Sequence, residues 1–278
     1  MYALDFEFDG QYLSDYGFIV CDFYNSNGYK VASAGSNITF CKVSVQSGKK
    51  NALTNTRYDE CLHAAFCILK NPSIYGKDNM QITNDEYIDL MRWLNRRVFL
   101  KFRFVNGDDY DGETCYFMGS FNISKIKIDD ILYGLELSIE TDAPFGYGQE
   151  QIHIWEVSDI TKQYILSDIS DEMGITYPSL TIEIKEDGDF LLCNAYGDDA
   201  HWKCNTMIKN CKAGEIITID GVTKEICSSL DTHDILNDFN YECFMIENSK
   251  STRRNRITCS LPCKIKLSYT PIIKNGLE

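Results

Sequence analysis

Histidine and cysteine are the side chains of this sequence that could bind a metal, and the chain holds 4 histidines and 12 cysteines. A zinc site needs two pairs of such ligands, each pair separated by roughly two to five residues. The closest spacings are His201-x-x-Cys204 and Cys259-x-x-x-Cys263, and neither has a second pair at the spacing of a zinc site. We therefore expect no metal site and no cofactor.

The cysteines lie mostly in apolar runs that read as strands, where a thiol behaves as a small buried hydrophobe. The chain begins MYALDFEFDG, which lacks the basic and apolar regions of a signal peptide. No run of about 18 apolar residues is present, so we expect no transmembrane span. These features predict reduced cysteines in a protein that is made in the cytoplasm and stays in solution.

Motifs of enzymatic catalysis are absent from the sequence. It contains no G-x-S-x-G turn, no phosphate-binding glycine loop and no H-E-x-x-H pair. Carboxylates are abundant, at 41, so a glycoside hydrolase that uses two acids stays open as a third interpretation. The acids gather at turns such as Asp187-Gly-Asp189 and Asp198-Asp199, where solvation explains them. We therefore predict that the protein is not an enzyme.

Aromatic side chains in the second half of the chain could stack on the face of a sugar ring. The candidates are Trp155 and Trp202, accompanied by Tyr164, Tyr177 and Tyr196. Tryptophan and tyrosine are also frequent in protein cores and at protein interfaces, which is the competing interpretation. A carbohydrate-binding or adhesin module is therefore kept as the main alternative function.

The charge balance limits the classes of partner. Lysine and arginine number 27 against 41 acids, which gives a net charge of −14. Nucleic acids and anionic membranes are bound by basic surfaces. The composition therefore argues against sequence-specific nucleic-acid binding and against membrane insertion.

The clearest structural signal is the stretch 82–104, in which a helix leads into a strand. Thr83 and Glu86 have the spacing of a capping box, with Ile82 and Tyr87 as a hydrophobic staple. An apolar stripe at helical spacing follows. The period then changes from 3.6 to 2 over residues 98–104, which predicts a strand. The helical stripe comprises Tyr87, Leu90, Met91 and Leu94.

The rest of the first half reads as strands. Residues 4–9 and 16–23 predict an opening hairpin with its turn at Asp9-Gly10. Strands are predicted at 38–45, 115–118, 123–128 and 132–141, and 25–35, 47–55 and 106–113 read as loop or turn. In the strand 132–141, Leu135, Leu137 and Ile139 alternate with polar residues and are expected to face inward. The segment 57–70 fits a helix or a strand. Residues 36–70 together could form a long arm that Asn71-Pro72 ends.

Residues 141–147, TDAPFGY, interrupt the strand pattern, and we place a domain boundary here, with domains 1–147 and 148–278. Beyond it, short strands alternate with turns rich in glycine, aspartate and asparagine, which predicts a β-sandwich. The expected fold class is mainly β, with an α+β first domain that has one helix. The predicted strands are 151–157, 179–185, 190–194, 215–220, 222–226, 241–247, 255–259 and 263–269. Apolar and polar residues alternate in two of them, which predicts one apolar face formed by Leu180, Ile182 and Ile184 and another formed by Ile265, Leu267 and Tyr269.

The order of these elements resembles the distal tail protein (Dit) family of bacteriophages that infect Gram-positive bacteria. The resemblance spans nearly the whole chain and is strongest over residues 1–150. It rests on order and spacing rather than on one motif. The matching segments are 13–20 (LSDYGFIV), 82–87 (ITNDEY), 92–94 (RWL), 134–135 (GL), 141–147 (TDAPFGY), 177–178 (YP), 214–220 (GEIITID) and 265–271 (IKLSYTP).

The resemblance implies a virion structural protein that forms a ring, expected to be hexameric, at the tail tip. Its arm, the belt, would correspond to residues 36–70 and clasp the neighbouring subunit, which favours a strand at 57–70. The second domain would be a galectin-like sandwich that serves for docking. Partners implied are the protein itself, the tail tube protein, the tail-associated hub protein and receptor-binding proteins that take part in host attachment. The implied belt residues are Phe40, Val43, Val45, Leu62, Phe66 and Ile68.

Overall fold

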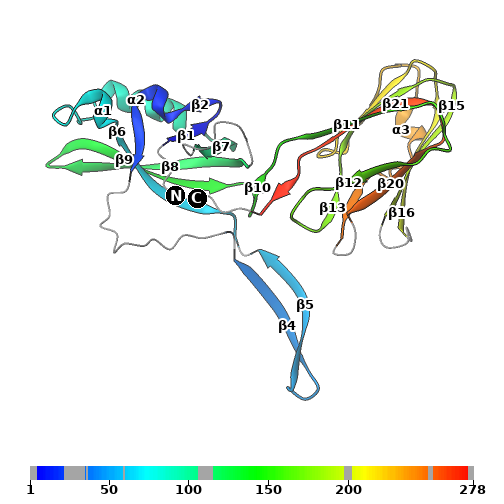
Figure 1. The fold of residues 1–278 in the computed structure, drawn as a ribbon, viewed down its shortest axis with the longest axis horizontal. Coiled ribbons are helices and arrows are strands. Elements are labelled where there is room, and N and C mark those ends of the chain that lie inside the picture. The colour runs from blue at the N-terminus through cyan, green and yellow to red at the C-terminus, as the bar shows by residue number, and fades with distance from the viewer. Residues whose placement is uncertain are drawn as a thin grey trace. The chain divides into compact units, whose positions relative to one another are not determined.

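The computed structural model describes residues 5–21, 35, 37–58, 60–105, 115–196, 202–249 and 253–274. The chain divides into two compact units, Met1–Gly148 with Ile273–Glu278, and Gln149–Ile272. Both units consist mainly of strands, which confirms the predicted mainly β class (Figure 1). The expected loop 25–35 and turn 106–113 lie almost entirely outside the described residues, as do His201 and Asp198-Asp199.

A seven-stranded antiparallel sheet organises the first unit, in the order β2-β1-β7-β8-β9-β6-β3. In β9 the predicted alternation is confirmed, because Leu135, Leu137 and Ile139 are buried and the residues between them are not. The strands are β1 (Asp5–Phe8), β2 (Gln11–Tyr12), β3 (Phe18–Cys21), β6 (His63–Lys70), β7 (Leu100–Val105), β8 (Phe117–Ile128) and β9 (Ile131–Thr141).

The opening segment does not form the simple hairpin predicted from its pattern. Strand β1 pairs with the two-residue β2 on one side and with β7 on the other. A 3-10 helix, η1 (Leu13–Tyr16), then turns the chain, and Gly17 ends it at φ 78°, a left-handed conformation that glycine adopts without strain. The chain therefore leaves β1, and β3 pairs with β6 at the opposite edge of the sheet.

Helix α2 (Asn84–Leu94) confirms the predicted helix and its cap. Thr83 Oγ1 accepts a hydrogen bond from the Glu86 amide at 3.3 Å, and Glu86 Oε2 accepts one from the Thr83 amide at 2.7 Å. These two bonds satisfy donors that the first turn of a helix leaves open. The other carboxylate oxygen of Glu86 lies 2.8 Å from Lys70 Nζ on β6, so the cap also ties the helix to the sheet.

The core of the first unit forms between α2 and the sheet. Trp93 was not part of the predicted stripe, yet its ring is buried and stacks on Phe6, with centroids 5.6 Å apart, and on Tyr16, at 4.5 Å. Its Nε1 donates a hydrogen bond to the carbonyl of Phe8 at 3.0 Å. The helix is thus fixed to β1 by aromatic stacking and by a satisfied polar group.

Three local features differ from the expectation. The short helices α1 (Pro72–Tyr75) and α3 (Ile235–Asp238) are additional to the one predicted. Strand β7 begins at Leu100 rather than at 98, and Val98 and Phe99 are exposed. The predicted strands 115–118 and 123–128 are one strand, β8, because the glycine and polar residues between them continue the ladder with β9.

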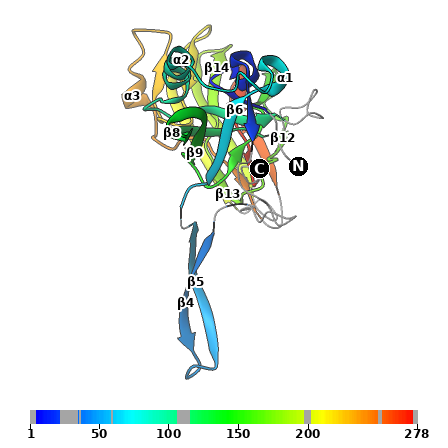
Figure 2. The same cartoon turned by 90° about the vertical axis from the view of Figure 1, so that its left-hand side faces the viewer.

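The predicted arm 36–70 is divided between two parts of the first unit. Strands β4 (Ile38–Val45) and β5 (Lys50–Tyr58) pair only with each other and form a separate two-stranded ribbon (Figures 1 and 2). Residues 46–49 make its turn, so the stretch 47–55 is partly strand rather than all turn. Residues 63–70 form β6, an interior strand of the seven-stranded sheet. The separate hairpin therefore covers residues 38–58.

The second unit is a two-sheet β-sandwich with β11-β21-β14-β17-β18 in one sheet and β12-β20-β15-β16 in the other. The five-stranded sheet comprises β11 (Gln151–Val157), β14 (Ser179–Ile184), β17 (Ile216–Ile219), β18 (Ile226–Ser228) and β21 (Cys263–Tyr269), and the four-stranded sheet β12 (Tyr164–Ser167), β15 (Gly188–Tyr196), β16 (Trp202–Cys211) and β20 (Arg254–Cys259). Short strands β10 (Gly146–Tyr147), β13 (Gly174–Thr176), β19 (Ile246–Asn248) and β22 (Ile272–Ile273) complete the described strands.

Alternation along these strands fills the sandwich. In β14, Leu180, Ile182 and Ile184 face the core, and in β21 Ile265 and Leu267 do so, as the sequence predicts. The sequence missed β12, β13 and β16, and it placed a strand at 222–226 where a turn precedes β18. These errors fall where turns and short edge pairs break the period-2 pattern.

Candidate functional site

The hairpin of β4 and β5 is the least buried regular element of the first unit. No residue between 38 and 58 falls in the buried class. Large apolar side chains are nevertheless present: Ile38 is 44% exposed, Phe40 53%, Val43 53% and Leu53 58%. An isolated two-stranded hairpin is marginally stable in water because it has no core of its own. These residues therefore have the composition of an interface without a covering partner.

The strand register distributes the apolar side chains over both faces of the ribbon. Directly paired residues share a face, and neighbours along a strand alternate. Phe40 pairs with Thr56 and Lys42 with Leu53, so Phe40 and Leu53 lie on one face together with Ile38. Val43 pairs with Ala52, which places both, with Val45, on the other face. A partner that buries this hairpin must therefore contact it on two sides.

Of the six predicted belt residues, Phe40, Val43 and Val45 lie on this hairpin, and three do not. Leu62 is 3% exposed and Ile68 is fully buried, and both belong to the core of the first unit. Phe66 packs against the same core and meets Phe104 at 5.1 Å between ring centroids. Alternation in β6 turns Phe66 and Ile68 inward, and Leu62 lies just before that strand, where its amide donates to Thr141 Oγ1. Their predicted place on a projecting arm is therefore wrong.

The two tryptophans considered for sugar stacking have different outcomes. Trp155 is half-buried and packs against the core of the sandwich. Its ring lies 5.8 Å from that of His153, on the same strand, and 5.7 Å from that of Tyr164, on β12 of the other sheet, between centroids. Trp202 begins β16, and its side chain lies outside the described residues.

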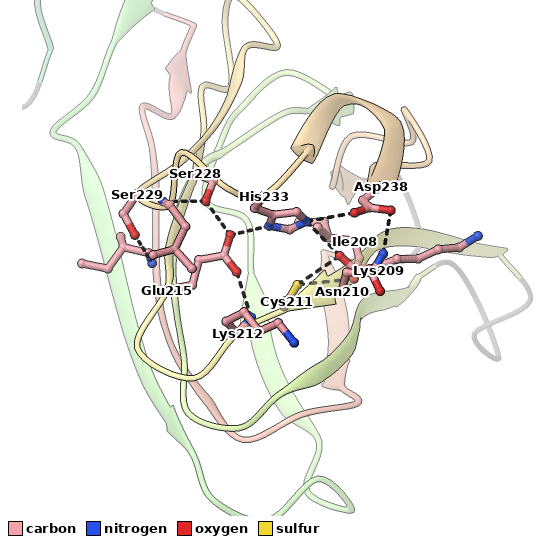
Figure 3. Close-up of polar contacts among 12 residues, drawn as sticks. Ile208, Lys209, Asn210, Cys211, Lys212, Glu215, Ser228, Ser229, His233 and Asp238 are labelled. Atoms are coloured by element: carbon pink, nitrogen blue, oxygen red, sulfur yellow. Dashed lines mark hydrogen bonds and ion pairs between the residues drawn. The ribbon is translucent and has the colours of Figure 1, made fainter.

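A buried polar network surrounds Glu215 in the second unit, and the sequence did not reveal it (Figure 3). His233 Nδ1 lies 2.5 Å from Glu215 Oε1, and Ser228 Oγ donates to the same oxygen at 2.5 Å. The amide of Lys212 donates to Glu215 Oε2 at 2.9 Å. His233 Nε2 faces the Lys209 carbonyl at 3.0 Å.

This network is built for structure rather than for nucleophilic chemistry. Both ring nitrogens of His233 face acceptors, so both carry protons and the ring is a cation opposite the Glu215 carboxylate. Burial alone would lower the pKa of His233, but its bonds to Glu215 and Lys209 and the charge of Asp238 raise it. Ser228 Oγ donates to the carboxylate and accepts a hydrogen bond from the Leu230 amide at 3.0 Å, so it bridges two parts of the chain. The group ties the loop before α3 to β16 and β17.

Other site chemistry is sparse in the described part of the chain. No group of three or more metal-ligating side chains gathers among residues 5–274 outside the gaps given above. No described helix has the length and apolarity needed to cross a membrane. Among the described residues, the arrangement that stands out is therefore the hairpin, with exposed apolar side chains on both faces.

Comparisons with known proteins relate this chain to phage tail proteins. Residues 1–143, more than half of the chain, match the model of a phage tail protein N-terminal domain, and residues 145–269 match that of a phage tail C-terminal domain. No curated protein matches the sequence.

Among solved structures, the chain is similar to the Dit protein of phage SPP1, described as a paradigm of the hub adsorption apparatus in phages infecting Gram-positive bacteria. The identity is 13%, the TM-score 0.64, and the match covers 96% of this chain and 98% of that one. Chains of the activated phage p2 baseplate with calcium and with strontium match at TM-scores of 0.48 and 0.45, with 8% and 9% identity and 95% and 97% coverage of this and that chain. The chain has the fold of the SPP1 protein from end to end and belongs to the phage tail protein family, as a structural component of the virion.

Proposed function

We propose that six copies of this protein close into a ring at the tail tip, and that each copy places its β4–β5 hairpin on the next. The observation that carries the proposal is a hairpin with large apolar side chains on both faces and no buried residue. Burying these side chains against a neighbour would supply the core that the hairpin lacks.

The geometry of a ring suits such a hairpin. In closed heterologous packing, one surface of each subunit meets a different surface of the next. The outer edges of β4 and β5 leave main-chain donors and acceptors that a neighbouring strand can pair. The hairpin therefore can combine side-chain burial with main-chain hydrogen bonds.

In this proposal the ring joins the tail tube protein to the tail-associated hub protein, and receptor-binding proteins attach at its periphery. The sandwich of the second unit is the docking platform, and the protein acts by assembly, without catalysis or a cofactor. The similarity in fold to the SPP1 Dit protein over 96% of the chain supports this role. Assembly would take place in the host cytoplasm before the tail is complete.

The first test is the solution mass by light scattering over a concentration series, with negative-stain imaging of the largest species. Six copies of 31.9 kDa give 6 × 31.9, or about 191 kDa. We expect a particle of that mass with a central hole. A protein that stays monomeric at every concentration, alone and with its tube and hub proteins, would overturn the ring.

Two hairpin variants test the interface itself. The first replaces residues 41–55 with Asn-Gly, which joins the paired residues Phe40 and Thr56 by a two-residue turn. The second is Phe40→Ser, Val43→Ser and Leu53→Ser. Each truncation removes on the order of 1 kcal/mol of burial, so we expect assembly to weaken about 100-fold or more.

The matched control truncates three exposed isoleucines of the second unit, Ile152→Ser, Ile154→Ser and Ile165→Ser, which are 50%, 58% and 51% exposed. We expect this control to assemble as the wild type does. Equal weakening in both triple variants would mean that general hydrophobicity, not the hairpin, drives association.

A further inference from the structure

The charge of the hairpin is opposite to that of the rest of the chain. Residues 37–58 contain Lys42, Lys49, Lys50 and Arg57 and no aspartate or glutamate. The whole chain has a net charge of −14, so the hairpin contributes +4 and the remainder −14 − 4 = −18. A chain with 41 acids thus contains a 22-residue hairpin segment without a carboxylate.

The four cations are placed to meet a partner. All four residues are exposed, and none of them takes part in an ion pair within the described residues. Lys42 Nζ lies 5.6 Å from the centre of the Phe40 ring, so cation and apolar side chain share one face. Lys49 and Lys50 lie at the turn and at the start of β5.

The partner must therefore be both anionic and able to bury apolar side chains. A duplex nucleic acid meets the first condition but offers little apolar surface, and the remaining −18 of the chain would repel its phosphates. A second copy of this chain meets both conditions. Outside the hairpin it carries the excess of carboxylates, and exposed apolar side chains such as Val98 and Phe99 can cover those of the hairpin.

Building on the proposed ring, we infer that the hairpin docks on a carboxylate-bearing surface of a second copy of this chain through Lys42, Lys49 and Lys50. Opposite charges would then orient each copy, because the net negative charges of the two bodies repel each other and the cationic hairpin attracts the neighbour. Charge would set the orientation of neighbouring subunits, and burial of the apolar side chains would stabilise it.

Zero-length carbodiimide coupling, which joins a lysine to a carboxylate in contact with it, tests this directly. Equal amounts of ¹⁴N- and ¹⁵N-labelled full-length protein are assembled, coupled and analysed by mass spectrometry. We expect mixed-isotope links from Lys42, Lys49 or Lys50 to aspartates or glutamates of the other copy. Assembled rings without mixed-isotope links at these lysines would overturn the inference and leave the proposed ring intact.

A matched pair of variants measures the effect on assembly. Lys42→Gln, Lys49→Gln and Lys50→Gln is compared with Lys162→Gln, Lys203→Gln and Lys266→Gln, which changes the net charge equally in the second unit. We expect the hairpin variant to need roughly 10-fold more protein for half-assembly than the control, as three surface ion pairs would give. The difference should shrink when salt rises from about 0.15 M to about 1 M, which shortens the Debye length from about 8 to about 3 Å.

Each outcome decides a different claim. Equal assembly of the two Gln variants overturns the role of charge but not the ring. A wild type that never assembles overturns the ring and this inference with it. Binding of a labelled DNA duplex that needs the three lysines, in rings that assemble without them, would assign the hairpin to nucleic acid instead.

Discussion

His233 Nδ1 lies 2.5 Å from Glu215 Oε1, and these side chains are 3% and 0% exposed. A carboxylate and a histidine are thus paired inside the sandwich, and the histidine's second nitrogen faces the Lys209 carbonyl and, at 3.3 Å, Asp238 Oδ2. Because each group keeps the other charged, the stability of the second unit depends on pH both below the ordinary pKa of a glutamate and above that of a histidine.

The free energy of unfolding, measured against pH, should have a plateau and fall on both sides of it. The pKa of His233 is raised above 6.5, so its stabilisation is present at low pH and is lost as pH rises through the raised value. Burial alone would raise the pKa of Glu215, but bonds from His233, Ser228 and the Lys212 amide lower it below 4.5, so its stabilisation is lost as pH falls through the lowered value. Urea unfolding from about pH 2 to about pH 9 measures both sides.

Replacing Glu215 by glutamine should remove the fall in stability that His233 causes as pH rises. The variant leaves His233 without its anionic partner, and breaking a buried pair in this way costs about 3–5 kcal/mol. The free energy of unfolding of Glu215→Gln should therefore be lower at neutral pH and flatter above it. If the free energy of unfolding of this variant fell with rising pH as steeply as that of the wild type, a group other than His233 would be responsible for the fall.

Trp93→Phe should destabilise the first unit by about 1–3 kcal/mol, because the Phe8 carbonyl loses the donor of its 3.0 Å bond. The ring at position 93 would still stack on Phe6 and on Tyr16 in this variant. Trp93→Ala removes the ring as well and should cost about 3–5 kcal/mol. Denaturant unfolding of both variants checks the order. Equal costs would mean that the hydrogen bond accounts for the whole effect.

The cap of α2 and its ion pair should be separable by mutation. Thr83→Ala removes a capping bond and should cost about 1 kcal/mol. Glu86→Gln keeps an amide that can cap but leaves Lys70, whose side chain is 3% exposed, without a charge partner, and should cost more. Adding Lys70→Met to Glu86→Gln should recover part of that loss. If the loss of stability in the double variant equalled the sum of the losses in the two single variants, coupling between the two residues would be ruled out.

Gly221→Ala should disrupt the second unit by a backbone collision. An added Cβ would lie 2.2 Å from the Tyr177 carbonyl oxygen and 2.9 Å from the Ser179 nitrogen, and neither atom can rotate away. We expect a loss of about 3 kcal/mol or more, the upper range for overpacking. Gly214→Ala is the control, because it has positive φ but open space, and should cost about 1 kcal/mol. Similar melting temperatures for the two variants would contradict the collision.

The features that the sequence predicted correctly depend on neighbours a few residues apart. The cap at Thr83 and Glu86 and the helix that follows are held by bonds spanning three or four residues, so their spacing is visible in the chain. Alternation in β9 and β14 likewise identified which side chains face a core. The stacking of Trp93 escaped this reasoning because its partners Phe6 and Tyr16 lie far away in the chain.

By itself, then, the sequence determined the mainly β class, the capped helix, the inward faces of the regular strands and the resemblance to phage tail proteins. Only the tertiary structure decided that residues 38–58 form a separate exposed hairpin while Leu62 and Ile68 lie in a core, and that Glu215 meets His233. The physical reason is that a strand's period shows which side chains share a face, whereas its pairing partner is chosen by contacts distant in the chain.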